Sequence, residues 1–187
     1  GSCYGGGDLE EVSRMCEVSA GGIAACGKTY SSNFPENVGS TFIGTPGNSD
    51  AYFTYFDNNY HRVVSTFFGG DSDDEFQGIA FGFNQHFVMA GYTTSDPITM
   101  SWGPSSAFND DTKGVTATCV MIAEFDIGGV RQWSTLYGHD QSFSSFSSVR
   151  ERPVANVALD HLGNLVLAGN ISYFSGVGFP SIETVAT

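Results

Sequence analysis

A short acidic run is the first feature of this sequence whose residue types could do chemistry. Asp71, Asp73, Asp74 and Glu75 all fall within residues 71–75. Calcium binds clustered oxygen ligands of this kind, but an EF-hand loop needs glycine at its sixth position, where this chain has Phe76. The acidic count also changes between the corresponding stretches of the sequence. We therefore expect a solvated loop and no cofactor, with calcium at these four carboxylates as the alternative.

The cysteines could form a metal site or a disulfide. No pair among the four has C-x-x-C spacing, which argues against zinc. Cys16 and Cys26 flank a predicted hairpin, at places that hold Ala80 and Ala90 in a later, similar segment. We expect this pair on adjacent strands with both side chains on one face. A disulfide, which an oxidising compartment would permit, and two small buried thiols both remain open.

The segment 97–113 is the strongest candidate for binding. It carries Trp102, Phe108, Asp110 and Asp111, and it is the longest departure from the repeat described below. A tryptophan on an exposed loop can stack on a sugar or on a partner protein. Loops held by a rigid scaffold are common binding elements. We predict these four residues as the binding site, and packing of Trp102 against its own sheet is the alternative.

Known catalytic motifs are absent from the sequence. It has no G-x-S-x-G elbow, no H-E-x-x-H pair and no phosphate-binding loop. Among its four histidines, His86 and His161 fall in predicted turns, where we expect exposed side chains. Asp57 and Asp126 recur at one place in the repeat and are typical of turn formers. We predict no catalytic residues, and the sequence favours a non-enzymatic protein without deciding the question.

A repeated pattern organises these residues. An aromatic-glycine step occurs three times, in the segments Tyr4-Gly5-Gly6, Phe68-Gly69-Gly70 and Tyr137-Gly138-His139. Each step precedes a polar loop and then an apolar hairpin, which ends in Cys26-Gly27, Ala90-Gly91 or Ala168-Gly169. A repeat of this length is one supersecondary unit that buries its apolar surface against its neighbours. We place the units at about residues 1–66, 67–135 and 136–187.

Each unit is predicted to consist of four short strands. In the second unit they cover about residues 78–83, 86–92, 118–125 and 131–136, which are rich in Phe, Tyr, Val and Ile and are separated by Gly, Asn and Asp. No segment shows sustained helical periodicity. Four antiparallel strands make one blade of a β-propeller, and propellers close with four to eight blades. We therefore expect an all-β fold of about two and a half blades, the first hairpin strand or its neighbour innermost, within a larger propeller.

The order of these motifs resembles a known family. The aromatic-Gly-Gly step in 65–70, the hairpin in 157–169 with Gly163-Asn164 at its turn, and the Phe-Pro pairs at 34–35 and 179–180 are similar to the bacterial β-propeller repeats called SBBP. This resemblance implies an exported bacterial protein, secreted or on the cell surface. Some members belong to gliding bacteria that use type IX secretion. The family has no shared catalytic residues, and this chain departs from it around residues 97–113 and in its cysteines.

The net charge of the chain limits the classes of partner that it can bind. Seven basic residues against twenty acidic ones give a net charge of −13, which argues against nucleic acid and against an anionic membrane surface. No apolar run is long enough to span a bilayer. We expect a non-catalytic surface or secreted module whose partners are other exported proteins, glycans or the rest of its own longer chain. The alternative is part of a secreted carbohydrate-active enzyme with its site in the propeller's top loops.

Overall fold

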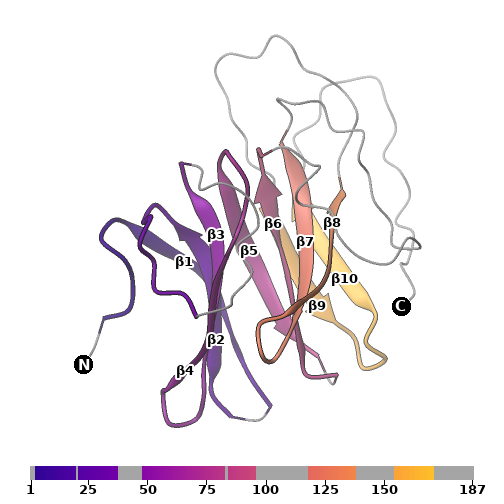
Figure 1. Ribbon diagram of the computed structural model, residues 1–187. Coiled ribbons are helices and arrows are strands. Elements are labelled where there is room, and N and C mark those ends of the chain that lie inside the picture. The colour runs from indigo at the N-terminus through magenta and orange to yellow at the C-terminus, as the bar shows by residue number, and fades with distance from the viewer. Residues whose placement is uncertain are drawn as a thin grey trace, which may run out of the picture.

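The computed structural model describes residues 3–19, 21–37, 48–82, 84–95, 118–137 and 154–170. Within these ranges the chain is all-β and contains no helix (Figure 1). In chain order the strands are β1 (Glu10–Glu17), β2 (Ile23–Thr29), β3 (Asp50–Phe56), β4 (Arg62–Phe68), β5 (Asp74–Phe81), β6 (His86–Thr93), β7 (Cys119–Asp126), β8 (Arg131–Tyr137), β9 (Val154–Leu159) and β10 (Leu165–Asn170).

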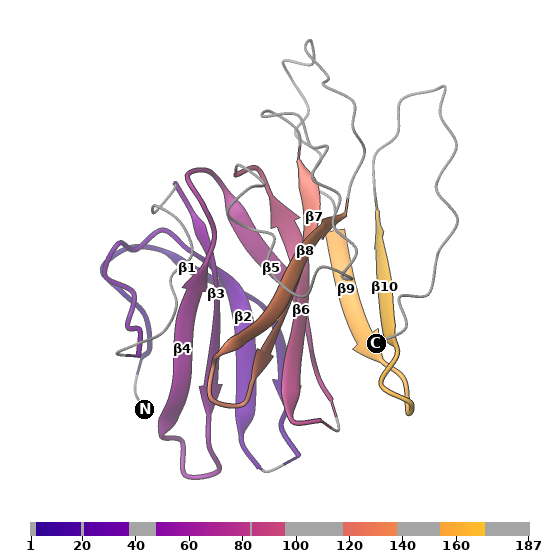
Figure 2. The same cartoon turned by 45° about the vertical axis from the view of Figure 1, so that its right-hand side comes forward.

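The strands form three antiparallel sheets, each a simple meander. Sheet one has the order β1-β2-β3-β4, sheet two has the order β5-β6-β7-β8, and β9 pairs with β10 in a two-stranded hairpin. The all-β class and the four-stranded antiparallel sheets expected from the sequence are confirmed. Within the described ranges no sheet closes on itself. Figures 1 and 2 show the three sheets side by side in chain order, with the β9–β10 hairpin at one end.

Five hairpins of the described chain are closed by one kind of turn. In each, the first residue donates its backbone N–H to a carbonyl four residues on; the pairs are Val18 and Gly22, Asp57 and His61, Gly82 and His86, Asp126 and Val130, and Asp160 and Asn164. The residue before each acceptor has a positive φ, at Gly21, Tyr60, Gln85, Gly129 and Gly163. Three of these turns begin with an aspartate, whose Oδ1 accepts two backbone N–H groups. Turn chemistry therefore sets the hairpin positions.

A bulge recurs in the first strand of both four-stranded sheets. The register shifts between Val12 and Arg14 in β1 and between Phe76 and Gly78 in β5. Gly91 lies opposite the second bulge, and a Cβ there would stand 1.8 Å from the carbonyl oxygen of Glu75. The strands can approach this closely only because Gly91 has no side chain.

Each sheet packs one of its faces on the opposite face of the next sheet in the chain. We call the face with Cys16, Ala24 and Cys26 the leading face of sheet one; its counterparts are Ala80, Val88 and Ala90 in sheet two and Ala158, Val166 and Ala168 in the hairpin. The opposite, trailing face carries Met15 and Ile23 in sheet one, Ile79 and Phe87 in sheet two, and Val157 and Leu165 in the hairpin.

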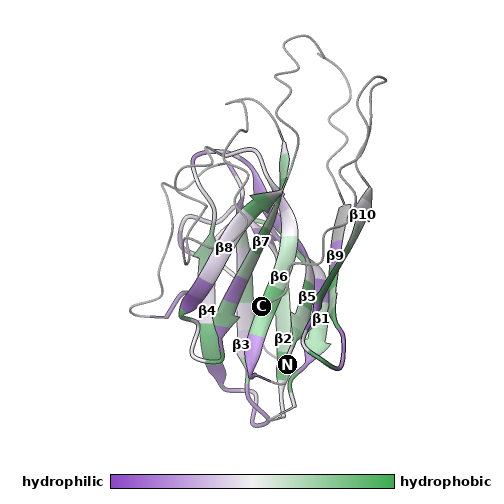
Figure 3. Cartoon of the chain, turned by 90° about the vertical axis from the view of Figure 1, so that its right-hand side faces the viewer, coloured by the Kyte–Doolittle hydropathy of each residue, from purple (hydrophilic) through white to green (hydrophobic). Residues whose placement is uncertain are grey.

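Two apolar layers result from this stacking. Between sheets one and two, the Phe53 ring lies 5.4 Å from that of Phe87 and 5.1 Å from that of Phe125, and all three side chains are fully buried. Between sheet two and the hairpin, a smaller cluster contains Val88, Ala90, Val120 and Ile122, with Val157, Leu159, Leu165 and Leu167 packed against it. Figure 3 shows hydrophobic residues along the strands and hydrophilic residues at the turns below them.

The first strands of the three units converge. β5 packs against both β1 and β9. Arg14, Gly78 and Asn156 occupy equivalent positions, since they pair with Cys26, Ala90 and Ala168 in turn. Arg14 Nη2 donates a 2.8 Å hydrogen bond to Asn156 Oδ1, so the first unit touches the third at the level of Gly78.

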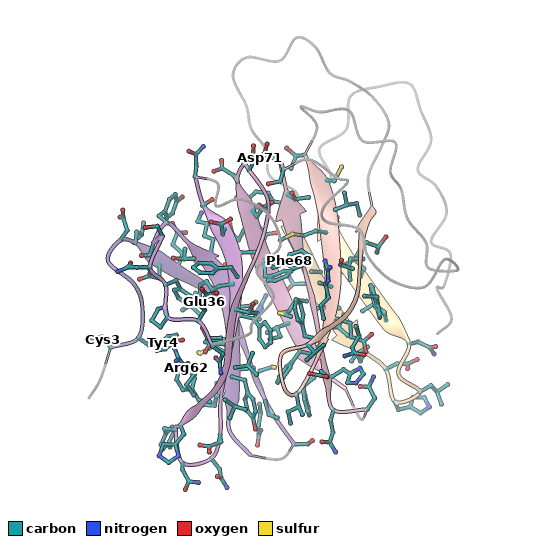
Figure 4. All side chains as sticks on the ribbon, viewed as in Figure 1. Cys3, Tyr4, Glu36, Arg62, Phe68 and Asp71 are labelled. Carbon is teal, nitrogen blue, oxygen red and sulfur yellow. The ribbon has the colours of Figure 1, made fainter. Side chains whose placement is uncertain are left out.

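On the trailing face of sheet one, the half that β3 and β4 form is covered by Phe34 and Tyr4, which lie outside the strands. Phe34 packs on Tyr52 and Phe67, with ring centroids 4.7 Å and 5.3 Å away. Tyr4 contacts Phe34 edge-on, and Arg62 donates a 3.2 Å hydrogen bond to the Tyr4 hydroxyl (Figure 4). Phe34 thus covers residues of β3 and β4.

Candidate functional site

The acidic run 71–75 does not form one cluster. Asp71 is exposed at the upper edge of the molecule (Figure 4), and Asp73 Oδ1 accepts a 3.2 Å hydrogen bond from Ser49 Oγ. Asp74 and Glu75 lie next to each other in β5 and therefore point to opposite faces. No group of three His, Cys, Asp or Glu side chains able to hold a metal occurs within the described ranges. The calcium alternative gains no support from this geometry.

Asp74 forms a carboxylate clamp that explains the aromatic-Gly-Gly step. Asp74 is fully buried, and its Oδ2 accepts hydrogen bonds from Gly70 N at 2.8 Å and from Ser95 Oγ at 2.7 Å. Ser95 in turn donates its backbone N–H to Thr93 Oγ1 at 3.0 Å. A Cβ at Gly69 would lie 2.6 Å from the same Oδ2, so a side chain there would displace the carboxylate.

The first unit builds the same clamp with glutamate. Glu10 Oε1 accepts hydrogen bonds from Gly6 N at 3.1 Å, from Ser31 Oγ at 2.5 Å and from Thr29 Oγ1 at 3.0 Å. Burial opposes ionisation of Glu10, but these hydrogen bonds outweigh it and lower the pKa of the carboxyl. In both clamps, a carboxylate at the start of a first strand fixes the glycine step to the end of a second strand.

Glu75 belongs to an ion-pair network between sheets one and two. Lys28 is buried, and its Nζ lies 3.5 Å from Glu75 Oε2 and 3.3 Å from Glu11 Oε2. Ser13 Oγ donates a 2.7 Å hydrogen bond to Glu75 Oε1. Burial lowers the pKa of Lys28, but the two carboxylates outweigh burial and raise it. The lysine therefore stays charged, and the network fixes how sheet two sits on sheet one.

The cysteine pair lies on adjacent strands with both side chains on the leading face. Cys16 pairs with Ala24 and Cys26 pairs with Arg14, so the two cysteines are diagonal neighbours. Both are free thiols. Burial raises the pKa of Cys16 to about 11 and raises that of Cys26 as well. Such thiols are protonated at neutral pH and are poor nucleophiles.

A polar cluster around Glu124 was not expected from the sequence. The buried Glu124 carboxylate of β7 accepts hydrogen bonds from Trp133 Nε1 of β8 and from Asn84 Nδ2, the latter at 3.3 Å, and contacts His86 Nδ1 of β6. The expectation that His86 is an exposed turn residue is wrong, because His86 opens β6 and is half-buried against this carboxylate. His161 is exposed.

The Glu124 cluster has no counterpart in the first unit. It lies on the leading face of sheet two, at the place that Tyr55 occupies in sheet one, since Tyr55 pairs with Ala24 and Glu124 pairs with Val88. Both carboxylate oxygens accept hydrogen bonds, which fixes the side chain and places a negative charge beside an apolar layer. Asp126, two residues further along β7, pairs with His86 and lies on the same face as Glu124.

The predicted binding residues Trp102, Phe108, Asp110 and Asp111 lie outside the described residues. The strands that carry their loop are described: β6 ends at Thr93 and β7 begins at Cys119. The tight turns of this meander all join the strands at one end of the sheet. The last residue of β6 and the first residue of β7 therefore lie at the other end, which is the edge meant here. The clamp residues Asp74 and Ser95 lie at that edge too.

Comparison of the chain with protein-family models and with curated proteins finds no match. The part of the chain that the structure describes has no helix of the length and apolarity needed to cross a membrane.

Proposed function

We propose that this chain forms about two and a half blades of a bacterial SBBP-type β-propeller and acts as a non-catalytic module for assembly and for binding of exported proteins or glycans. In this proposal the protein is secreted or displayed on the cell surface. Further blades complete the propeller, and the first strands β1, β5 and β9 stand nearest its axis.

The proposal rests on one observation: the polar residues that recur in the repeat form the same hydrogen bonds within the scaffold. Glu10 and Asp74 make the same hydrogen bonds in two units, each to a glycine N–H and a serine hydroxyl. The turn aspartates Asp57, Asp126 and Asp160 likewise repeat one pattern of two backbone hydrogen bonds. Residues that satisfy the backbone in this repeated way serve the scaffold, which leaves function to the parts that differ between units.

The convergence of first strands supports the propeller geometry. In a propeller the blades pack face to face and their innermost strands approach the axis, where side chains of non-neighbouring blades can meet. Arg14 and Asn156 meet in this way past Gly78. The strand ends that flank residues 97–113, at Thr93 and Cys119, lie opposite the tight turns.

Deletion of residues 98–112 tests the binding site. We expect the β-type circular-dichroism spectrum to remain nearly unchanged, because both flanking strand ends are held within sheet two. Binding to soluble polysaccharides, measured by affinity electrophoresis, and to exported proteins, measured by surface plasmon resonance, should disappear. Substitution of Tyr60, which is 80 % exposed on a tight turn, by alanine is the matched control and should leave binding intact. Unchanged binding after the deletion refutes the site.

The enzyme alternative is tested with the intact protein. Incubation with a panel of polysaccharides, followed by a reducing-sugar assay, should release no new ends. Release that disappears in a Glu124→Gln variant would replace the proposed function by a carbohydrate-active enzyme, because Glu124 is the buried carboxylate of the polar cluster.

A further inference from the structure

The outer edge of sheet one is formed by a strand whose sequence favours pairing with its own copies. β4 is the last strand in the order β1-β2-β3-β4, so among the described residues it is an edge strand of that sheet. Residues 63–68 read Val-Val-Ser-Thr-Phe-Phe and contain no charge, no proline and no glycine. Segments of about six residues with this composition stack with identical segments into cross-β sheets. Such a strand at an open edge is a site of aggregation, so the way this edge is covered matters.

Asn37 covers the edge of β4 with the hydrogen bonds that an added strand would make. Its backbone N–H donates a 3.0 Å hydrogen bond to the carbonyl oxygen of Ser65, and its Nδ2 donates a 2.7 Å hydrogen bond to the carbonyl oxygen of Val63. The two acceptors are two residues apart, so both belong to the side of the β4 backbone that faces away from β3. A strand that added to this edge would need the same two oxygens.

A strap of residues 34–37 holds Asn37 in this place. The Phe34 ring fixes the start of the strap on Tyr52 and Phe67, and the Tyr4 hydroxyl donates a 2.7 Å hydrogen bond to the carbonyl oxygen of Pro35. The strap therefore crosses from the trailing face of sheet one to the outer edge of β4. Neighbouring sheets of this chain pack through their faces, so a further sheet stacked in the same way would leave this edge to the strap.

We propose that Asn37 guards the outer edge of β4 and prevents it from pairing with β4 of a second copy of this chain. The guard is an inhibitory contact built into the fold and is independent of the proposed binding function. It consists of two hydrogen bonds, so loss of both should raise the fraction of chains with an open edge about 10- to 30-fold. A charge of −13 on each copy opposes the encounter, and added salt should speed the pairing of opened edges.

Thioflavin T fluorescence of the folded full chain, followed over time, measures cross-β association. Asn37→Pro removes both donors and should raise the initial rate about 10- to 30-fold, whereas Asn37→Ala removes only the side-chain donor and should raise it about 3- to 10-fold. Asn33→Ala is the matched control. It also loses one hydrogen bond, because Asn33 Oδ1 accepts the backbone N–H of Gly7 at 2.8 Å, but it leaves β4 guarded. It should associate at the rate of the unaltered chain.

A charge on the edge strand tests where the copies meet. Val63 is 37 % exposed, so Val63→Lys places a lysine on β4 without burying it, and a lysine on an edge strand opposes strand addition. Added to Asn37→Pro, it should return the rate to that of the unaltered chain. Hydrogen exchange of the associated Asn37→Pro protein should show new protection in residues 62–68.

Three results would overturn the guard. The first is an Asn37→Ala rate equal to that of the unaltered chain. The second is an equal acceleration by Asn33→Ala, which indicates general destabilisation. The third is fast association that Val63→Lys leaves unchanged, which places the contact elsewhere. Circular dichroism shows which variants fold, and if Asn37→Pro does not, the comparison of Asn37→Ala with Asn33→Ala decides.

Discussion

Replacement of Gly91 by alanine should break the bulge that joins β5 to β6. The added Cβ would stand 1.8 Å from the Glu75 carbonyl oxygen and 2.8 Å from Phe76 Cα. A carbon and a carbonyl oxygen need about 3.3 Å, so the strands must part by about 1.5 Å. That movement stretches neighbouring N–H···O contacts beyond hydrogen-bond range.

The cost follows from the bonds and the packing lost. Two ladder hydrogen bonds contribute about 2 kcal/mol together. Displacement of the fully buried Phe76 adds about 1–3 kcal/mol, the usual cost of overpacking a core. The Gly91→Ala protein should therefore lose about 3–5 kcal/mol of its free energy of unfolding. With an m-value of about 2 kcal/mol/M, the urea midpoint falls by about 1.5–2.5 M.

Urea unfolding followed by tryptophan fluorescence and circular dichroism measures this loss. Gly27→Ala should lower the urea midpoint by a similar amount, because its Cβ would also stand 1.8 Å from a backbone oxygen, that of Glu11. Gly128→Ala is the control, since its Cβ meets no atom closer than 3.3 Å. It should stay within about 1 kcal/mol of the unaltered protein. A Gly91→Ala midpoint within about 0.5 M of the unaltered protein would refute the bulge.

Two further predictions concern acidic residues of the scaffold. The folded pKa of Glu10 lies below the ordinary glutamate value of 4.5, so Glu10 contributes stability that is present above pH 4.5 and is lost as the pH falls through the folded pKa. The urea midpoint of Glu10→Gln should therefore fall less between pH 7 and pH 3 than that of the unaltered protein, and equal falls contradict the clamp. Asp126 Oδ1 accepts backbone N–H groups of Gly128 and Val130, each at 2.9 Å, so Asp126→Ala should cost about 1–2 kcal/mol in thermal unfolding, whereas an unchanged midpoint excludes the turn hydrogen bonds.

The strands and turns could be predicted because their signals are local. The aromatic and β-branched runs place β6, β7 and β8 within about two residues of their observed bounds. Asp57 and Asp126 were expected as turn formers, and each begins a tight turn with two hydrogen bonds to backbone N–H groups.

The clamp could not be predicted because a bulge hides the start of its strand. The shift between Phe76 and Gly78 breaks the alternation of side chains, so the strand seems to begin at Gly78, although β5 starts at Asp74. Asp74 and Glu75 therefore look like two members of one solvated run. A strand that begins at Asp74 separates the two carboxylates onto opposite faces, one to a serine and the other to Lys28.

The Glu124 cluster was missed because its members come from three separate segments of the chain. Trp133 follows Glu124 by nine residues and His86 precedes it by 38, so no short motif unites them. One signal was available: Glu124 stands in an apolar run at the place where the preceding unit has Tyr55. A charged residue that replaces an aromatic one at equivalent positions deserves a search for its partners.

The hydrogen bond between Arg14 and Asn156 changes the order in which the units of this array should unfold. Repeat arrays are usually described by intrinsic unit stabilities and nearest-neighbour terms, so that they unzip from the ends. This bond adds a next-nearest-neighbour coupling of about 0.5–1.5 kcal/mol, because it joins the first and third units past Gly78. When the first sheet frays, the hairpin at the far end loses a partner at the same time. The two ends therefore open together more often than nearest-neighbour terms alone would give.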